Sequence, residues 1–268
     1  MKLYAISDLH VGHPPNYRAL VDIPAYPDDW LIIAGDIGEK IAHFHATFRI
    51  LTQRFAKLFW VPGNHDLWTV PSSDSLLRGV ARYEYLVELC RSYGVVTPED
   101  PYVAWAGDTN TLIVPTFALY DYSFRAANLS KKEALAHAKS VDIYCADEIL
   151  LRPEPYESIE AWSAARVAYT EERLAALPSD KSLILINHWP LREDLARLPR
   201  IPQFRLWCGT KRTEVRLQQY PIETVIYGHL HIRRTSHIDG VQHREVSLGY
   251  PRHWDSARGL PSYLQEIR

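Results

Sequence analysis

Seven side chains that suit metal binding lie in five short motifs along the chain. Their donor atoms are carboxylate oxygens, one amide oxygen and imidazole nitrogens, a mixture that suits the borderline divalent metals Mn²⁺, Fe and Zn²⁺. Seven donors are too many for one tetrahedral ion, yet they suffice for two ions if one carboxylate bridges them. The seven residues are Asp8, His10, Asp36, Asn64, His188, His229 and His231.

Two divalent ions about 3.5–4 Å apart are suited to in-line displacement at phosphorus. One ion activates water as hydroxide, and both ions neutralise the phosphate oxygens. Glycines stand beside Asp36, Asn64 and His229, where they let the backbone turn sharply and approach closely. The residue types therefore predict a metal-dependent phosphoesterase, provided that the fold brings the five motifs together.

Each motif follows a short apolar run that is typical of a buried strand. Ligands of open sheets bind beyond the carboxyl ends of the strands, so we expect the five motifs to share one rim. Each residue alone could be a turn former or a helix cap, but seven such placements after strands argue against chance. The five runs are residues 2–6, 30–34, 57–61, 182–186 and 224–227.

The rest of the pattern predicts an α/β fold, a four-layer αββα sandwich of two packed mixed sheets flanked by helices. We expect one domain over residues 1–268, with residues 116–180 forming a helical lid. Apolar spacing predicts helices over 41–55, 81–93, 131–151 and 158–177. Further strands are expected at 94–96, 233–238 and 242–246, with a hairpin of 103–105 and 111–114 around a turn at 107–110.

Composition and charge narrow the classes of function. Hydrophobic residues make up 47% and charged residues 23% of the 268 residues, as in ordinary globular proteins. The formal charge of −2 provides no basic surface for specific nucleic-acid binding. Cys90, Cys145 and Cys208 are scattered without CxxC spacing, which favours a reducing cytoplasm. We expect no signal segment and no membrane span, and the oligomeric state stays open.

The ordered motifs DxH, GDxxE, GNHD, NH and GHxH, from residue 8 to residue 231, resemble those of the calcineurin-like metallophosphoesterase superfamily. The resemblance implies one metal on Asp8, His10 and His231 and another on Asn64, His188 and His229, with Asp36 bridging both. It also implies that His65 protonates the leaving oxygen and that Asp66 orients His65. Glu39 stands where many relatives have Asp, and we place it outside the ligand set. Lys40-Ile41 replaces the Arg-Gly of protein Ser/Thr phosphatases, which disfavours that subfamily.

Several other segments resemble actinobacterial phosphopantetheinyl hydrolases, which remove the 4'-phosphopantetheine arm from carrier proteins. The likeness implies an acyl carrier protein as partner and a phosphodiester between serine and pantetheine as substrate. Residues that we expect near the substrate are His13, Tyr120, Tyr122, Arg192 and Trp207. The segments are 60–65, 94–99, 119–124, 206–210 and 227–231.

Three alternatives stay open at this stage. The enzyme could act on a small-molecule phosphodiester or phosphomonoester of the nucleotide type, and the fold could serve as a non-catalytic protein-binding platform. The aromatic residues 117–124 suit a buried turn as well as a substrate wall. The donor set does not separate Mn, Fe and Zn, although we expect manganese to support activity in vitro.

Overall fold

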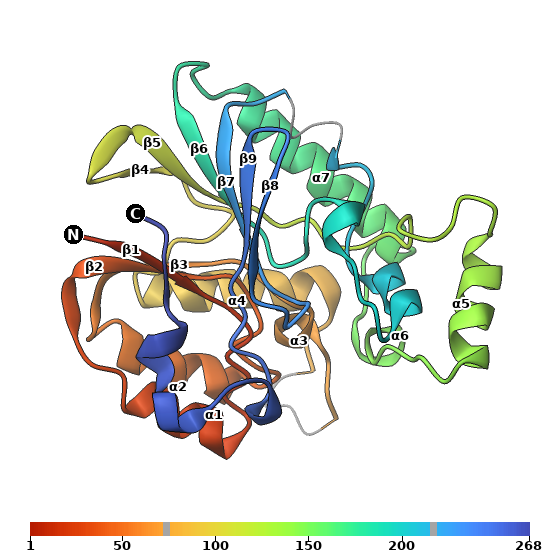
Figure 1. Cartoon of the computed structure of the whole chain (residues 1–268), viewed down its shortest axis with the longest axis horizontal. Helices are drawn as coiled ribbons and strands as arrows, with labels where there is room; N and C mark the ends of the chain where they lie inside the picture. Colours follow the sequence, from red (N-terminus) through yellow and green to blue (C-terminus); the bar gives the residue numbers. More distant parts are fainter. Residues whose placement is uncertain (72–75, 215–218) are drawn as a thin grey trace.

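The computed structural model describes residues 1–71, 76–214 and 219–268, and it contains two β-sheets. The smaller sheet has the strand order β10-β1-β2-β3 (Figure 1). Its parallel strands are β1 (Leu3–Ile6), β2 (Tyr26–Ile33) and β3 (Phe55–Trp60), and β10 (Gln265–Glu266) pairs antiparallel with β1.

The larger sheet has the strand order β4-β5-β6-β7-β9-β8. Its four central strands are parallel, and each edge strand is antiparallel to its neighbour, so both sheets are mixed as predicted. The strands are β4 (Val103–Trp105), β5 (Asp108–Pro115), β6 (Ser182–Ile186), β7 (Ile222–Tyr227), β8 (Arg234–Ile238) and β9 (Val241–Glu245).

The two sheets pack face to face through one apolar layer. Ala5 and Phe59 of the smaller sheet lie in the same buried cluster as Ile184 and Ile226 of the larger sheet. These strands carry nearly continuous apolar runs because helices cover their outer faces as well. A parallel bridge between Ser7 and Ser247 links the two sheets just beyond β1.

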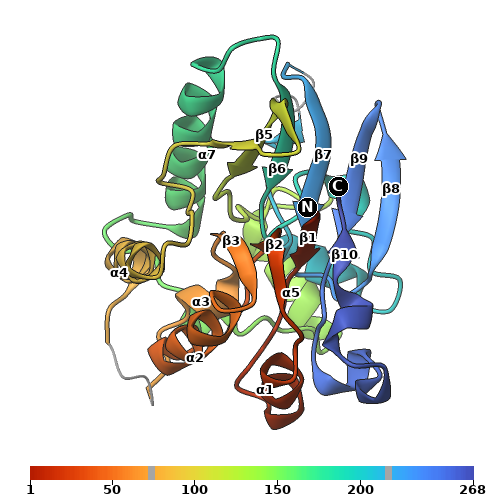
Figure 2. The same cartoon turned by 90° about the vertical axis from the view of Figure 1, so that its left-hand side faces the viewer.

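Helices cover both outer faces and complete the predicted four layers (Figure 2). The smaller sheet is covered by α1 (Pro14–Val21), α2 (Ile41–Leu51) and α4 (Gly79–Ser92), which contribute Leu20, Phe44 and Leu86 to one buried cluster. On the larger sheet, Val167 and Leu174 of α7 (Ile159–Ala175) pack against β6 and β7. Helix α7 is therefore a layer of the fold, which corrects the expectation that it belongs to a lid.

The rest of the expected lid is an insertion beside the sheets, with α5 (Lys131–Ser140) and α6 (Asp147–Leu150). Ser130 and Glu133 form a capping box at the start of α5, where Ser130 Oγ accepts from the Glu133 amide at 3.2 Å. The predicted helix over 131–151 is interrupted because the chain leaves the helical conformation at Asp142, which has a φ of 57°. Helix α5 packs against the 3-10 segment η2 (Pro202–Trp207).

Two local predictions were wrong. Residues 94–96 form no strand, because Val96 makes only an isolated bridge to Phe59 after the turn at Gly94. The hairpin turn lies at residues 106–107 rather than 107–110, since β5 begins at Asp108. The remaining short elements are α3 (Asn64–Leu67), η1 (Glu193–Leu195), η3 (Pro251–His253), η4 (Ser256–Arg258) and η5 (Leu260–Tyr263).

No helix within residues 1–71, 76–214 and 219–268 is both long enough and apolar enough to cross a membrane.

Candidate metal centre

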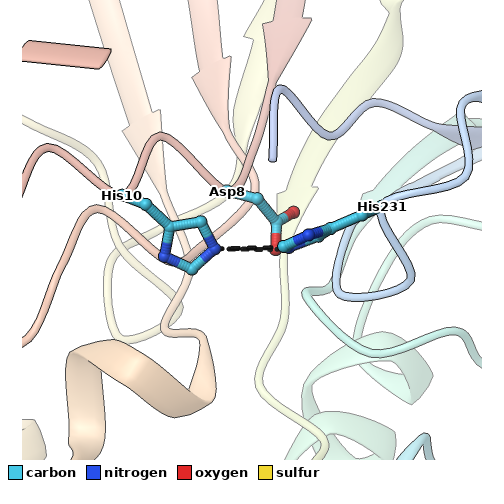
Figure 3. A group of neighbouring side chains, drawn as sticks. All are labelled: Asp8, His10 and His231. Carbon is cyan, nitrogen blue, oxygen red and sulfur yellow. Dashed lines mark hydrogen bonds and ion pairs between the residues drawn. The ribbon is translucent and has the colours of Figure 1, made fainter. Parts of the chain in front are cut away.

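The loop after β1 and the loop after β7 bring three predicted donors together (Figure 3). Asp8 Oδ1 lies 2.9 Å from His231 Nε2 and 3.8 Å from His10 Nε2. The Nε2 atoms of His10 and His231 are 3.2 Å apart. One carboxylate oxygen and two imidazole nitrogens thus face a common point, which is an arrangement that suits a cation.

A second group of donors comes from the loops after β3, β6 and β7. Asn64 Oδ1 lies 3.2 Å from His188 Nε2 and 3.1 Å from His229 Nδ1. Asp36 lies between the two groups, because its Oδ2 is 3.5 Å from His188 Nε2 and 3.9 Å from His10 Nε2. The expectation that all five motifs meet at one rim is confirmed, while the ion that each donor binds stays a prediction.

Backbone strain is concentrated at these donors. Eight non-glycine residues in the described part of the chain have a positive φ, and five of them belong to the predicted ligand set. Such conformations cost of order 1–3 kcal/mol each and persist only where the surrounding structure enforces them. The five strained donors are Asp8, His10, Asp36, His229 and His231.

The alternation in the DxH and HxH motifs has a packing reason. Leu9 and Leu230, the middle residues of the two motifs, are buried in the core. The donors on either side of each leucine lie beyond the strands and all have a positive φ, so this loop conformation directs them toward the metal centre while the leucine stays in the core.

Two glycines allow the carboxylates to approach the backbone. A Cβ on Gly63 would overlap Asp36 Oδ1, and a Cβ on Gly228 would overlap Asp8 Oδ2 and Ser7 Oγ. A larger residue at either position would therefore displace a predicted ligand.

Burial keeps three histidines of the centre neutral, whereas at His231 burial is outweighed by the charge of Asp8, which raises the pKa. Burial lowers the pKa of His10 and His229 well below the usual value, and it lowers the pKa of His188 to about 4. His188 Nδ1 donates to the carbonyl oxygen of Ala34 at 2.9 Å, which leaves the lone pair on Nε2 directed at Asn64 and Asp36. Neutral imidazoles with fixed tautomers are the form that binds a metal.

The pKa values of the two carboxylates of the centre shift in opposite directions. Burial, followed by the charges of Asp8 and Asp66, raises the pKa of Asp36 well above the usual value. Burial also acts to raise the pKa of Asp8, but the charge of His231 holds this pKa well below the usual range. Two buried carboxylates with His231 as the one imidazole of raised pKa fit a bound cation, because a cation would compensate both carboxylate charges.

The predicted acid, His65, is held by Glu39 rather than by Asp66. His65 Nδ1 lies 2.9 Å from Glu39 Oε1, and its Nε2 lies 3.3 Å from the hydroxyl of Tyr250. The ring also packs on Trp68, with the centroids 3.7 Å apart. The expected role of Asp66 is therefore corrected, and Glu39, which we had placed outside the ligand set, takes over the orienting contact.

Asp66 binds the backbone of the neighbouring loops instead. Its carboxylate accepts hydrogen bonds from the amides of Asp36 and Gly63 at 3.0 Å and from the amide of Gly38 at 3.1 Å. Burial raises the pKa of Asp66 to about 6, and these backbone donors oppose that rise. Asp66 stands at the start of α3, where its carboxylate turns back toward free amides and fixes the loop that carries Asp36.

Residues 1–233 match the model of the calcineurin-like phosphoesterase family. The chain belongs to this family. A relative, the acyl-carrier-protein phosphodiesterase PptH of Mycobacterium tuberculosis, is 47% identical over 270 residues, which cover 99% of this chain and 82% of the relative. The resemblance that the motifs indicated is thereby confirmed.

Two solved structures have folds similar to that of this calcineurin-like phosphoesterase. The crystal structure of phosphopantetheinyl hydrolase PptH from Mycobacterium tuberculosis gives a TM-score of 0.93 at 44% identity, covering 99% of this chain and 95% of that chain. A dimetal phosphatase from Danio rerio gives a TM-score of 0.50 at 12% identity, covering 96% and 90%, and shares the fold.

Most residues expected near the substrate lie away from the centre of the phosphoesterase. Tyr120 and Trp207 are 0% and 2% exposed, and neither lines the cleft at the metal centre. The Tyr122 hydroxyl and Trp207 Nε1 both donate to Glu148 Oε1, at 2.8 and 2.6 Å. The aromatic residues therefore anchor α6, which corrects their expected substrate contact and bears out the buried alternative.

Arg192 also lies away from the metal centre, so its predicted contact with the substrate is wrong. Its guanidinium pairs with Asp194 and Asp239, at 2.9 and 2.7 Å, and it lines a separate cavity outside the metal cleft. The reason is local, since two nearby carboxylates saturate the fork that we expected to hold a phosphate. The ring of His13, by contrast, lies 6.5 Å from that of His10 on the exposed rim, and its substrate contact stays a prediction.

Several residues at the centre had no signal in the sequence. Asp8 Oδ2 accepts from Ser7 Oγ at 2.6 Å and from Ser247 Oγ at 2.7 Å. Asn64 Nδ2 donates to Asp147 Oδ1 at 2.9 Å. His253 Nδ1 also reaches the centre, where it lies 3.0 Å from His231 Nδ1.

Proposed function

We propose that this phosphoesterase binds two divalent ions and releases 4'-phosphopantetheine from a carrier protein by hydrolysing a phosphodiester. The observation that carries the proposal is the meeting of seven oxygen and nitrogen donors from five strands. One ion would be held by Asp8, His10 and His231, the other by Asn64, His188 and His229, with Asp36 between them. The choice of substrate follows the PptH relative, which is an acyl-carrier-protein phosphodiesterase.

Bound at these donors, two ions would lower the pKa of a water molecule and neutralise the phosphate oxygens. The chain itself supplies the proton for the leaving group. His65 lies at the cleft, Glu39 accepts from its Nδ1, and its Nε2 faces the cleft beside the hydroxyl of Tyr250. When His65 is protonated on both ring nitrogens, Nε2 donates its proton to the serine oxygen of the carrier protein as the phosphorus–oxygen bond breaks, while Nδ1 keeps its hydrogen bond to Glu39.

The cleft suits a long substrate arm with an anionic end. Its volume is about 660 Å³, and it extends from the metal centre over apolar residues that include Leu198, Ile201 and Phe204. Arg200 and Arg252 are exposed at the same cleft, where their positive charge favours an anionic phosphoester. The apolar wall would pack against the pantetheine arm while the arginines attract the phosphate-bearing partner.

The proposal extends to the metal and to the compartment. Manganese, iron and zinc all suit the donor set, and we propose manganese for assays in vitro. Cys90, Cys145 and Cys208 are free and buried, which supports a reducing cytoplasm as the place of action.

The test is incubation of the manganese-loaded protein with a holo acyl carrier protein, followed by mass spectrometry of the carrier. We expect the carrier to lose the phosphopantetheine arm, and His229→Ala to abolish the loss. An unchanged carrier together with metal-dependent hydrolysis of bis(p-nitrophenyl) phosphate would show that the substrate is another phosphodiester. Activity on p-nitrophenyl phosphate alone would indicate a monoesterase, and no turnover with any of the three metals would indicate a binding platform.

A further inference from the structure

A carboxylate from the insertion reaches the metal centre. Asp147 lies in α6, is 1% exposed, and stands more than eighty residues after the ligand that it contacts. Its Oδ1 accepts from Asn64 Nδ2 at 2.9 Å and from Trp68 Nε1 at 2.6 Å. The ring of Trp68 in turn packs against the ring of His65 at an interplanar angle of 32°. Asp147 Oδ1 therefore contacts both Asn64, a predicted metal ligand, and Trp68, which packs against the predicted acid His65.

The contact matters because an amide side chain has two different ends. Only the oxygen of Asn64 has a lone pair for a metal, whereas its Nδ2 carries two hydrogens. An ionised carboxylate only accepts hydrogen bonds, so Asp147 fixes the nitrogen end on its own side. The oxygen end is then turned toward His188 and His229, at 3.2 and 3.1 Å.

The position of Asp147 is itself fixed by its neighbour in α6. Glu148 Oε1 accepts hydrogen bonds from Tyr122 and Trp207, both of which are buried. These two contacts hold α6 against the body of the protein. The short helix thus carries adjacent acids with different tasks, one that anchors the insertion and one that reaches the centre.

We propose that Asp147 is a positioning residue that fixes the amide of Asn64 for metal binding, so that the insertion selectively controls the affinity of one of the two metal positions. The inference rests on the proposed function insofar as it assumes two bound ions. A residue that hydrogen-bonds a metal ligand without binding the metal itself typically contributes a factor of about 10–100 to metal affinity. We therefore expect loss of Asp147 to weaken the ion at Asn64, His188 and His229 and to spare the ion at Asp8, His10 and His231.

The experiment is calorimetric titration of the chelator-stripped protein with Mn²⁺. The manganese that stays bound after dialysis is then measured. Wild type is expected to bind two ions, whereas Asp147→Ala binds one ion as before and the second roughly 10–100-fold more weakly. Asp147→Asn is expected to recover most of the affinity, since its side-chain oxygen can still accept from Asn64. Asp142→Asn, on the exposed turn before α6, is the matched control and should match wild type.

The outcomes separate the two proposals. A wild-type protein that binds fewer than two ions would overturn the proposed function. A wild type with two ions and an Asp147→Ala variant with unchanged affinity at both positions would overturn the role of Asp147 alone. If Asp147→Ala fails to fold, Asp147→Asn decides the matter together with Asp147→Ser, because a serine cannot reach Asn64 yet keeps a polar group. Equal weakening in these two variants would also contradict the inference.

Discussion

Glu39 and His65 form a hydrogen-bonded pair in which Glu39 Oε1 lies 2.9 Å from His65 Nδ1. Burial opposes ionisation of Glu39, but the hydrogen bond and the charge of His65 lower its pKa to about 2. The backbone carbonyl of Glu39 also accepts from the buried guanidinium of Arg82 at 2.6 Å. Glu39 is therefore a fixed anion at neutral pH, and it directs the Nε2 of His65 toward the cleft.

Removal of this contact tests the assignment of Glu39. Glu39→Ala is expected to lower kcat roughly 10–100-fold, because the imidazole loses the partner that orients it. Glu39→Gln keeps an oxygen that can accept from Nδ1 and should lose less activity. Steady-state kinetics of phosphopantetheine release from a holo acyl carrier protein, whose serine alkoxide needs a proton as it leaves, would measure both, with the exposed Glu84→Gln as control. An unchanged kcat in Glu39→Ala would show that another group orients His65.

The role of His65 predicts a dependence on the leaving group. An alkoxide needs a proton as it departs, and a positioned acid contributes typically 10²–10⁴-fold to such a step. A nitrophenolate leaves without one. His65→Ala should therefore slow release from a carrier-protein serine by about that factor and slow hydrolysis of the nitrophenyl diester far less. Equal losses on the two substrates would assign His65 to binding rather than to proton transfer.

The close approach of Gly228 to Asp8 predicts a steric effect on metal binding. In Gly228→Ala the new methyl group would overlap Asp8 Oδ2 and Ser7 Oγ, so we expect manganese affinity and activity to fall at least roughly tenfold. Gly240→Ala is the comparison, since that position is open but has a φ of 81°. It should cost about 1 kcal/mol of stability and leave activity intact. Retention of both ions by Gly228→Ala would contradict the prediction.

Stability at acid pH is expected to depend on Glu99, which lines a cleft separate from the one at the metal centre. Burial opposes its ionisation, but the charge of Arg166 and the hydroxyl of Tyr83 hold its pKa below the usual value. Because the folded-state pKa is depressed, ionised Glu99 stabilises the protein above its unfolded-state pKa of about 4.3. That stability is lost as the pH falls through the folded-state pKa.

Urea unfolding of the metal-free protein from neutral pH to about pH 3 measures this effect. Glu99→Gln should be less stable than wild type at neutral pH, and the difference should shrink as the pH falls. A difference that is the same at every pH would show that the ionisation of Glu99 does not contribute.

The donors of the centre could be predicted from the sequence because their location is set by where each strand ends along the backbone. Asp8, Asp36 and His188 each follow a buried strand by two or three residues, so parallel strands deliver them to one rim. The choice between Asp66 and Glu39 as partner of His65 depends instead on side-chain direction. Asp66 is next to His65 in the chain, but its carboxylate turns back to the amides of Gly38 and Gly63. Adjacency in sequence was therefore misleading.

The contribution of the insertion could not be predicted for a different reason. Asp147 reaches Asn64 only because the path of the insertion returns α6 to the rim, and no periodic pattern encodes that path. The same limit explains Tyr122 and Trp207. An aromatic side chain after a strand suits a substrate wall or a buried contact equally well, and here both residues bind Glu148.

The most direct test of the whole account is the manganese content of the chelator-stripped and reloaded protein, measured by plasma mass spectrometry after dialysis. The geometry predicts two ions per wild-type chain and a loss of both in Asp36→Ala, because Asp36 stands between the two groups of donors. A wild-type chain that retains one ion or none, or an Asp36→Ala variant that still retains two, would contradict a dinuclear centre at this rim.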